Sequence, residues 1–127
     1  MTQQHSTTPT FAGIVPPVAT PLTAEGAIDH ASLERVVDHL VEGGAHGLFA
    51  LGSAGETAYL TNAQRVEVLS TIVKTAAGRV PVIAGAIELT AERILEAARP
   101  LAAAGADAIV TTAAVYAIND QAETADH

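Results

Sequence analysis

The sequence predicts an α/β fold in which parallel strands alternate with helices. Apolar strand-like runs and amphipathic helical stretches follow one another along the chain. The glycines that end the predicted helices, Gly44, Gly78 and Gly105, recur about every 30 residues, the length of a βαβ repeat. The strands are apolar throughout, as in sheets covered on both faces. Two architectures fit: a small doubly wound sheet, or the first half of an eight-fold βα barrel, which needs about 250 residues in all.

The first part of the chain is predicted to contain two strands and one helix. Residues 11–20 (FAGIVPPVAT) are apolar and predict the first strand. Asp29 is a suitable N-cap for a helix whose apolar residues recur at helical spacing until Gly43-Gly44 ends it. Residues 46–51 (HGLFAL) predict the second strand, which leads into a glycine-containing loop.

The second helix begins with a capping-box pattern, in which Thr61 and Gln64 satisfy each other's backbone donors. Its predicted apolar face consists of Val66, Leu69, Ile72, Val73 and Ala76. Residues 80–85 (VPVIAG) then predict the third strand.

Thr90 is the expected N-cap of a third helix. The apolar face of that helix is expected to consist of Ile94, Leu95, Ala98, Leu101 and Ala102. Residues 108–112 (AIVTT) predict the fourth strand, and residues 121–127 are expected to begin another helix.

The composition limits the class of protein. The chain has 14 acidic and 6 basic residues, a formal charge of −8, so it offers too little positive charge for a nucleic-acid backbone. With 49% hydrophobic and 16% charged residues, it is expected to fold around a core. It has no cysteine, which excludes disulfides and thiolate chemistry and agrees with a cytoplasmic location. The five histidines include no close pair, so no metal site is predicted.

The sequence predicts a disordered N-terminal tail followed by one folded domain. Residues 1–10 are polar and predict a disordered tail, without the basic start and apolar run of a secretory leader. No stretch predicts a membrane span, since the least charged one, residues 101–118, is rich in alanine and contains Asp107. The folded domain is therefore expected to span residues 11–127.

The sharpest candidate for a functional site is the loop Gly52-Ser53-Ala54-Gly55-Glu56, which follows the second predicted strand. In either architecture, ligands bind where the strands end and the helices begin. The two glycines allow a tight turn with amides that can face an anion, and Ser53 adds a hydroxyl that can relay a proton. The loop lacks the lysine of a P-loop, the third glycine of a dinucleotide fingerprint and the first glycine of a nucleophile elbow. A plain strand-to-helix turn is an equally good interpretation of these residues alone.

The loops at residues 20–21, 85–88 and 112–116 are predicted to lie at the same end of the sheet as this glycine loop. Tyr116 follows the fourth strand and can donate a proton, although a lone loop tyrosine more often serves packing. Glu56 is expected to stabilise a helix N-terminus. Lys74, the only lysine, is expected to face solvent from the second helix. His46 and Asp107 lie where strands begin and are interpreted as structural.

Three segments together resemble the dihydrodipicolinate synthase / N-acetylneuraminate lyase family. They are Val18-Ala19-Thr20-Pro21, the loop at residues 52–56, and Val82-Ile83-Ala84-Gly85, in the order and spacing of the family. The loop, of the form G-[ST]-[ST]-G-E, is the most specific part, and the resemblance runs from about Phe11 to the end of the chain. It implies the N-terminal half of a (β/α)8 barrel, with about four strands and three to four helices.

The resemblance also implies a chemistry. Members of the family form a Schiff base between a lysine and a 2-oxo acid, usually pyruvate, and the resulting enamine adds to, or is released from, an aldehyde without a further cofactor. By resemblance, the amides of Ser53 and Ala54 hold the carboxylate of the 2-oxo acid, and Ser53 takes part in a proton relay. Tyr116 matches the catalytic tyrosine that shuttles the proton. A homo-oligomeric lyase or synthase is implied.

The chain departs from the family pattern in three ways. Ala54 replaces a second hydroxyl residue, which removes a hydrogen bond to the carboxylate worth about 1.5–3 kcal/mol. Ala114-Val115 precede Tyr116 where the family usually has proline and an aromatic residue. The Schiff-base lysine belongs to the sixth strand, beyond the end of this chain, and Lys74 cannot replace it.

Two hypotheses about function follow. In the first, the chain is part of a lysine-dependent, aldolase-type lyase or synthase, and these residues do not define its aldehyde substrate. The alternative is a non-catalytic half-barrel, a truncated product or an assembly module. Because half a barrel has two open sheet edges, the chain on its own is expected to self-associate.

Overall fold

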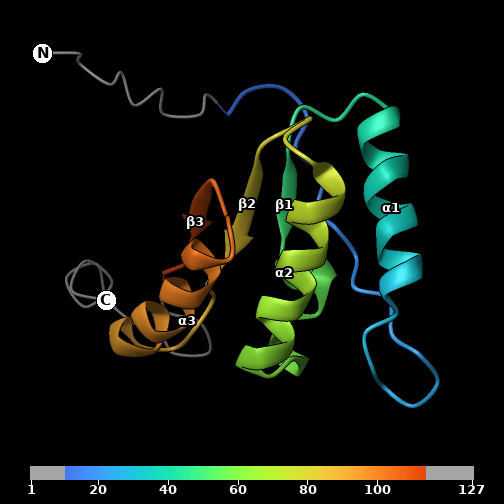
Figure 1. The fold of residues 1–127 in the computed structure, drawn as a ribbon. Helices are drawn as coiled ribbons and strands as arrows, with labels where there is room; N and C mark the ends of the chain where they lie inside the picture. Colours follow the sequence, from blue (N-terminus) through green and yellow to red (C-terminus); the bar gives the residue numbers. More distant parts are fainter. Residues whose placement is uncertain (1–10, 114–127) are drawn as a thin grey trace, which may run out of the picture.

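The computed structural model describes residues 11–113, which form a three-stranded parallel sheet and three α-helices (Figure 1). The strands lie side by side in the order β1 (Leu48–Ala50), β2 (Val82–Gly85) and β3 (Ala108–Val110). The helices are α1 (His30–Glu42), α2 (Asn62–Ala76) and α3 (Ala91–Ala103). Helix α2 connects β1 to β2 and α3 connects β2 to β3, so the predicted βαβ repeat is confirmed. Each strand is shorter than the apolar run that predicted it.

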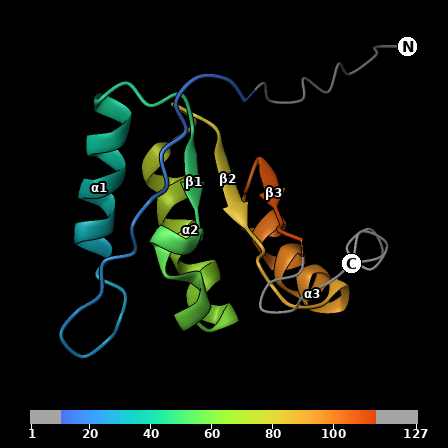
Figure 2. The same ribbon diagram turned by 180° about the vertical axis from the view of Figure 1, so that it is seen from behind.

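The predicted first strand, residues 11–20, is wrong in its extent. The segment runs alongside β1 (Figure 2), but it forms only one isolated parallel bridge, between Pro17 and Phe49. The Phe49 N–H donates to the carbonyl of Pro16 at 3.0 Å, and the Val18 N–H donates to the carbonyl of Phe49 at 2.8 Å. Pro16, whose carbonyl faces β1, has no N–H to donate to that strand, so a regular ladder cannot form here. Residues 14–18 are called the edge segment below.

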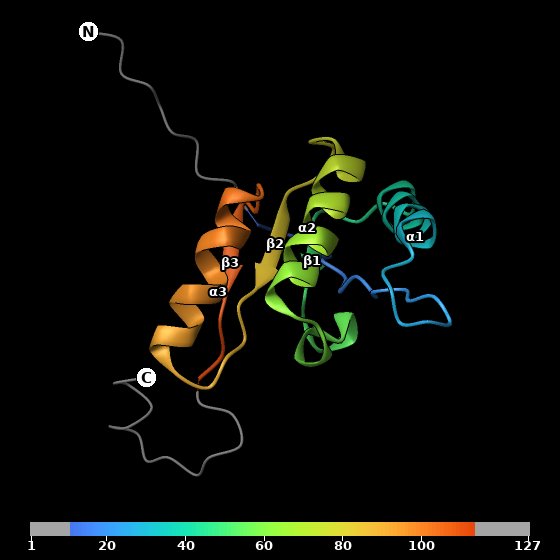
Figure 3. The same cartoon turned by 60° about the horizontal axis from the view of Figure 1, so that its bottom comes forward.

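The helices gather on one side of the sheet. Helices α2 and α3 lie across one face, each in contact with the strand that follows it, and α1 packs beside α2 (Figures 1 and 3). Seen from behind, the strands and the edge segment lie nearer the viewer than α2 and α3 (Figure 2). This arrangement is consistent with a partial barrel, in which helices form an outer layer around parallel strands.

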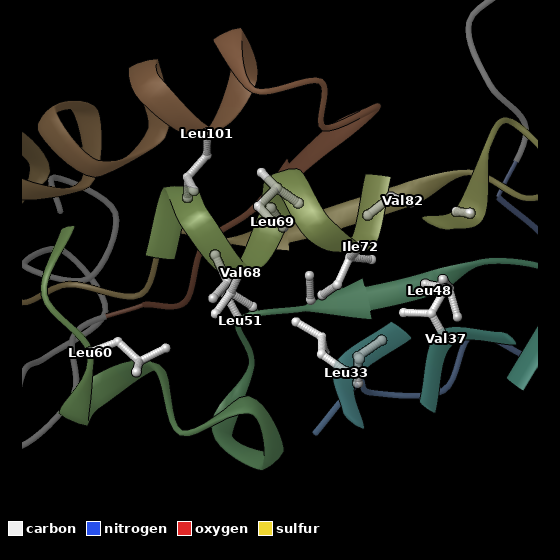
Figure 4. Close-up of a cluster of buried hydrophobic side chains, with 14 of the residues drawn as sticks. Leu33, Val37, Leu48, Leu51, Leu60, Val68, Leu69, Ile72, Val82 and Leu101 are labelled. Carbon is white, nitrogen blue, oxygen red and sulfur yellow. The ribbon is translucent and has the colours of Figure 1, made fainter. Parts of the chain in front are cut away.

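The core lies between this face of the sheet and the helices. Val37 of α1 lies next to Leu48 of β1, and Leu33 of α1 and Ile72 of α2 belong to the same buried cluster (Figure 4). The largest fully buried side chains are Leu33, Leu48, Leu51, Leu69, Ile72, Leu101, Val18, Val37 and Val68. Alternate residues of β1 are buried, and the same alternation holds in β2 up to Ala84, so both strands have one face on the core.

The buried face of α2 differs from the predicted one. Three of its five predicted residues are buried, whereas Val66 and Val73 are only half-buried. Arg65 and Val68 complete the buried face instead. The buried face is therefore rotated about the helix axis relative to the predicted one, and it includes a charged residue.

The buried face of α3 also differs from the prediction. Ala97 and Leu101 are buried, whereas Leu95 is 55% exposed and Ala102 is exposed. Thr90 caps this helix as predicted, because its hydroxyl accepts a hydrogen bond from the backbone of the third helical residue.

Side-chain caps fix where the first two helices begin. The Asp29 carboxylate accepts hydrogen bonds from the Ser32 N–H at 3.0 Å and from the Ser32 hydroxyl at 2.6 Å. The side-chain and backbone hydrogen bonds from Ser32 hold the pKa of Asp29 below its usual range. At α2, the Gln64 N–H donates to Thr61 Oγ1 at 3.2 Å, and the Thr61 N–H donates to Gln64 Oε1 at 2.9 Å. The predicted N-cap and capping box are both confirmed.

Candidate functional site

The candidate site is built on the segment that leaves β1 at the carboxyl end of the sheet, residues 51–60, called the site loop below. Leu51 is fully buried but has a left-handed backbone, with φ of 59°. Two short 3₁₀ turns follow, η1 (Ser53–Gly55) and η2 (Thr57–Tyr59). Glu56 lies between them and is also left-handed, with φ of 55°. The chain thus folds back on itself twice before α2 begins.

Two neighbouring amides of the site loop are free to bind a ligand. Within residues 11–113, the N–H groups of Ser53 and Ala54 donate no backbone hydrogen bond, and both residues are exposed. The next two amides, of Gly55 and Glu56, donate to the carbonyls of Gly52 and Ser53 at 3.0 Å each. Adjacent free N–H groups at the start of a helical turn can hold an anion such as a carboxylate.

Thr20 anchors the site loop from one side. Its side chain is buried, and its hydroxyl donates to the carbonyl of Gly55 at 2.8 Å. The loop approaches so closely that a Cβ at Gly55 would lie 3.1 Å from the carbonyl oxygen of Val18. The sequence placed residues 20–21 among the loops at the ligand-binding end of the sheet, but it did not indicate that Thr20 anchors the site loop.

A network of charged residues holds the other side of the site loop. Arg65 donates from Nε to the carbonyl of Thr57 at 3.1 Å and from a terminal nitrogen to Glu88 Oε1 at 2.5 Å. Arg93 Nε donates to Glu88 Oε2 at 3.1 Å. The side chains of Arg65 and Glu88 are each 9% exposed. Sequence reasoning missed this network, although Arg65 lies one helical turn before Leu69 on the buried face of α2 and so had the spacing of a buried residue.

The charge state of Glu88 follows from these partners. Burial raises the pKa of its carboxyl, but the hydrogen bonds and positive charges of Arg65 and Arg93 together outweigh that effect. The pKa of Glu88 therefore lies below its usual range, and the carboxylate is ionised at neutral pH.

A cavity of about 400 Å³ opens between the site loop and the connection from β2 to α3. Ser53 and Tyr59 line it from the loop, and Glu88, Leu89 and Arg93 line it from the other side. Tyr59 is 85% exposed and Leu89 is 51% exposed, so the cavity is open at its rim.

The sequence-predicted site residues lie in different parts of the molecule. Ser53 and Ala54 lie together on η1, as their place in the loop requires. Tyr116 lies outside the described residues. Lys74 is exposed on α2, as expected. Glu56 is the N-cap residue of the single 3₁₀ turn η2, and its exposed side chain makes no capping hydrogen bond, so its expected stabilisation of a helix N-terminus stays a prediction.

His46 and Asp107 lie at the amino ends of the strands and make structural hydrogen bonds. His46 Nδ1 accepts from the Ile14 N–H at 3.1 Å, which ties the edge segment to the start of β1. Asp107 Oδ2 accepts from the Val82 N–H at 2.8 Å, which joins β3 to β2. The structural interpretation of both residues is confirmed.

Between residues 11 and 113, no group of three or more histidine and acidic side chains is placed to hold a metal ion. In the same part of the chain, no helix is both long and apolar enough to cross a bilayer.

The dihydrodipicolinate synthetase family matches residues 10–127 of the sequence. The chain belongs to this family. Over 106 residues it is 40% identical to a 4-hydroxy-tetrahydrodipicolinate synthase from Jannaschia sp. (strain CCS1), an alignment covering 84% of this chain and 36% of that protein. It is 35% identical to a probable 2-dehydro-3-deoxy-D-pentonate aldolase from Escherichia coli (strain K12), again over 84% of this chain, and 35% of the relative.

A solved structure gives the same result for the fold. A prophage protein of the dihydrodipicolinic acid synthase family from Escherichia coli K12, in complex with pyruvate, has a TM-score of 0.83 and 34% identity to this chain. The match covers 90% of this chain and 38% of that one. The chain therefore spans about a third of the length of the curated relatives it matches. The fold agrees with the partial barrel that the resemblance implied.

Proposed function

We propose that these residues supply the 2-oxo-acid-binding part of an aldolase-type lyase or synthase that acts through a lysine Schiff base. The observation that carries the proposal is the pair of free amides at Ser53 and Ala54, beside the Ser53 hydroxyl at the carboxyl end of β1. The Schiff-base lysine lies outside this sequence, and the edge segment with β1, β2 and β3 forms the first four strands of the barrel. Residues 11–127 then belong to one barrel domain.

The reaction gives each residue a role. The lysine amine adds to the keto carbon of pyruvate and loses water, and the resulting imine allows the methyl group to lose a proton and become a nucleophilic enamine. The amides of Ser53 and Ala54 hold the substrate carboxylate, so the keto carbon is oriented toward the lysine. Ser53 and Tyr116 relay protons during imine formation and during addition of the enamine to an aldehyde.

Reduction of the imine tests this function. The longest natural polypeptide that carries this sequence is incubated with pyruvate and borohydride, and its intact mass and peptide map are measured. We expect one covalent pyruvate adduct, on a lysine other than Lys74. A Lys74→Arg variant should form the same adduct, because Lys74 is exposed on α2. Absence of an adduct, or its loss in Lys74→Arg, would contradict the proposal.

Ala54 offers a second test of the site. Ala54→Ser restores a hydroxyl beside the carboxylate, and a hydrogen bond to a charged group is worth about 1.5–3 kcal/mol. The KM for pyruvate is therefore expected to fall at least about tenfold. Ala58→Ser is the matched control, since Ala58 is also exposed on the site loop but lies in η2, four residues beyond Ala54. Equal changes in the two variants would argue against carboxylate binding at Ala54.

A further inference from the structure

Glu88 and Arg65 form a buried ion pair. Each side chain is 9% exposed, and their closest atoms are 2.5 Å apart. Removing two charges from water is costly, and an apolar pair of similar volume is often as stable. The contacts of the pair suggest a different use, because they join parts of the chain that are distant in sequence.

The pair joins three segments around the cavity. Arg65 lies in the first turn of α2, and Glu88 lies in the connection from β2 to α3. From this position Arg65 also donates to the carbonyl of Thr57 in η2. Glu88 is in turn held by Arg93 of α3. The position of the site loop is thereby fixed relative to two helices.

Thr57 transmits this restraint to the anion-binding amides. Its carbonyl accepts from Arg65 at 3.1 Å, and its N–H donates to the carbonyl of Gly52 at 3.5 Å. Gly52 directly precedes Ser53, and the Gly52 carbonyl also accepts from Gly55. The guanidinium of Arg65 is therefore linked through Thr57 alone to the turn that presents the amides of Ser53 and Ala54.

We propose that Glu88 is a positioning residue: by holding Arg65 on Thr57, it fixes η1 and η2 so that the amides of Ser53 and Ala54 stay aligned for the substrate carboxylate. This inference rests on the proposed function for its effect on pyruvate. Thr20 restrains the same loop from the opposite side through Gly55, so loss of Glu88 releases one of two anchors.

The arrangement needs the fork of an arginine. One terminal nitrogen of Arg65 donates to Glu88 and, at 3.3 Å, to Asn62 Oδ1, while Nε of the same planar group donates to the carbonyl of Thr57. A lysine supplies a single ammonium, which can keep the ion pair with Glu88 but cannot reach all three. Arg65→Lys therefore separates the positioning role from mere charge balance.

The test uses three variants of the longest natural polypeptide that carries this sequence: Glu88→Gln, Arg65→Lys and the control Asp38→Asn. Asp38 pairs with Arg79 at 2.5 Å, but both side chains are well exposed and lie far along the chain from the site loop. Circular dichroism confirms folding, steady-state kinetics give KM and kcat for pyruvate, and hydrogen exchange reports the peptide of residues 51–60.

We expect Glu88→Gln and Arg65→Lys to raise the KM for pyruvate about tenfold and to change kcat less than threefold, because a binding contact is weakened. Exchange of residues 51–60 should accelerate in both variants and not in Asp38→Asn. Unchanged KM and exchange in the two variants would overturn the proposal, as would equal changes in the control. If the wild type forms no pyruvate adduct, the proposed function fails, and loop exchange alone then decides whether Glu88 holds the loop.

Discussion

Leu51 and Gly85 meet backbone to backbone where β1 and β2 end. Leu51 is held in the left-handed region, a conformation that costs a residue with a side chain about 1–2 kcal/mol. A Cβ built on Gly85 collides with the carbonyl oxygen of Leu51. Because Gly85 has no side chain, the Leu51 carbonyl can lie against it where the site loop leaves the sheet.

Gly85→Ala is expected to lower the free energy of unfolding by about 3 kcal/mol, because the clash is with backbone that cannot rotate away. Urea unfolding measures this value. Gly26→Ala serves for comparison, since Gly26 has φ of 83° but open space around its Cβ, so it should lose only about 1 kcal/mol to backbone strain. Similar losses in the two variants would mean that the collision is unimportant.

Individual residues could be predicted from the sequence when their signal is local. The glycine loop identified Ser53 and Ala54, because turn residues after an apolar strand indicate the edge at which ligands bind. Arg65 and Glu88 could not be found as a pair. Charged residues are expected in solvent, and each of these is buried only because its partner, 23 positions away in sequence, lies beside it.

Helices and strands, like single residues, could be predicted where their signal is local. The three helices were predicted with nearly correct starts, because Asp29, Thr61 and Thr90 satisfy backbone donors within a single turn. The first strand was not, since an apolar run predicts burial but not whether neighbouring N–H groups exist to form a ladder. Pro16 was visible in the sequence, and a proline whose missing N–H faces the neighbouring strand limits the ladder that can form there.

The first turn of helix α2 carries both the capping box and Arg65. Thr61→Ala removes one half of the capping box and is expected to destabilise the protein by about 1 kcal/mol. Thr61→Ser keeps the hydroxyl and should retain most of the stability. Thermal unfolding of both variants measures the difference, and equal stability of Thr61→Ala and the wild type would show that the cap contributes nothing.

At the scale of the molecule, two carboxyl groups connect folding to pH. The pKa values of Glu88 and Asp29 are lowered from 4.5 and 3.8, so both groups stabilise the fold at pH values above those numbers. That contribution is lost as the pH falls through the lowered pKa values of the folded state. Stability should therefore decrease below about pH 4.5.

Glu88→Gln should be less stable than the wild type at neutral pH, because Arg65 loses its buried partner. Its stability should also fall less steeply in acid, since one of the two titrating groups is gone. Urea unfolding at a series of pH values measures both effects. Parallel pH profiles for the two proteins would exclude Glu88 as a source of acid sensitivity.

The two prolines of the edge segment also affect what can attach to the sheet. Ile14, Pro16 and Val18 direct their backbone groups toward β1, so the backbone of Pro17 faces the opposite side. That side has no donor at Pro17, and a foreign strand aligned there would miss a hydrogen bond in the middle of its ladder. A strand that pairs with this border, including a strand that closes the proposed barrel, therefore does so with one hydrogen bond fewer than at a proline-free edge.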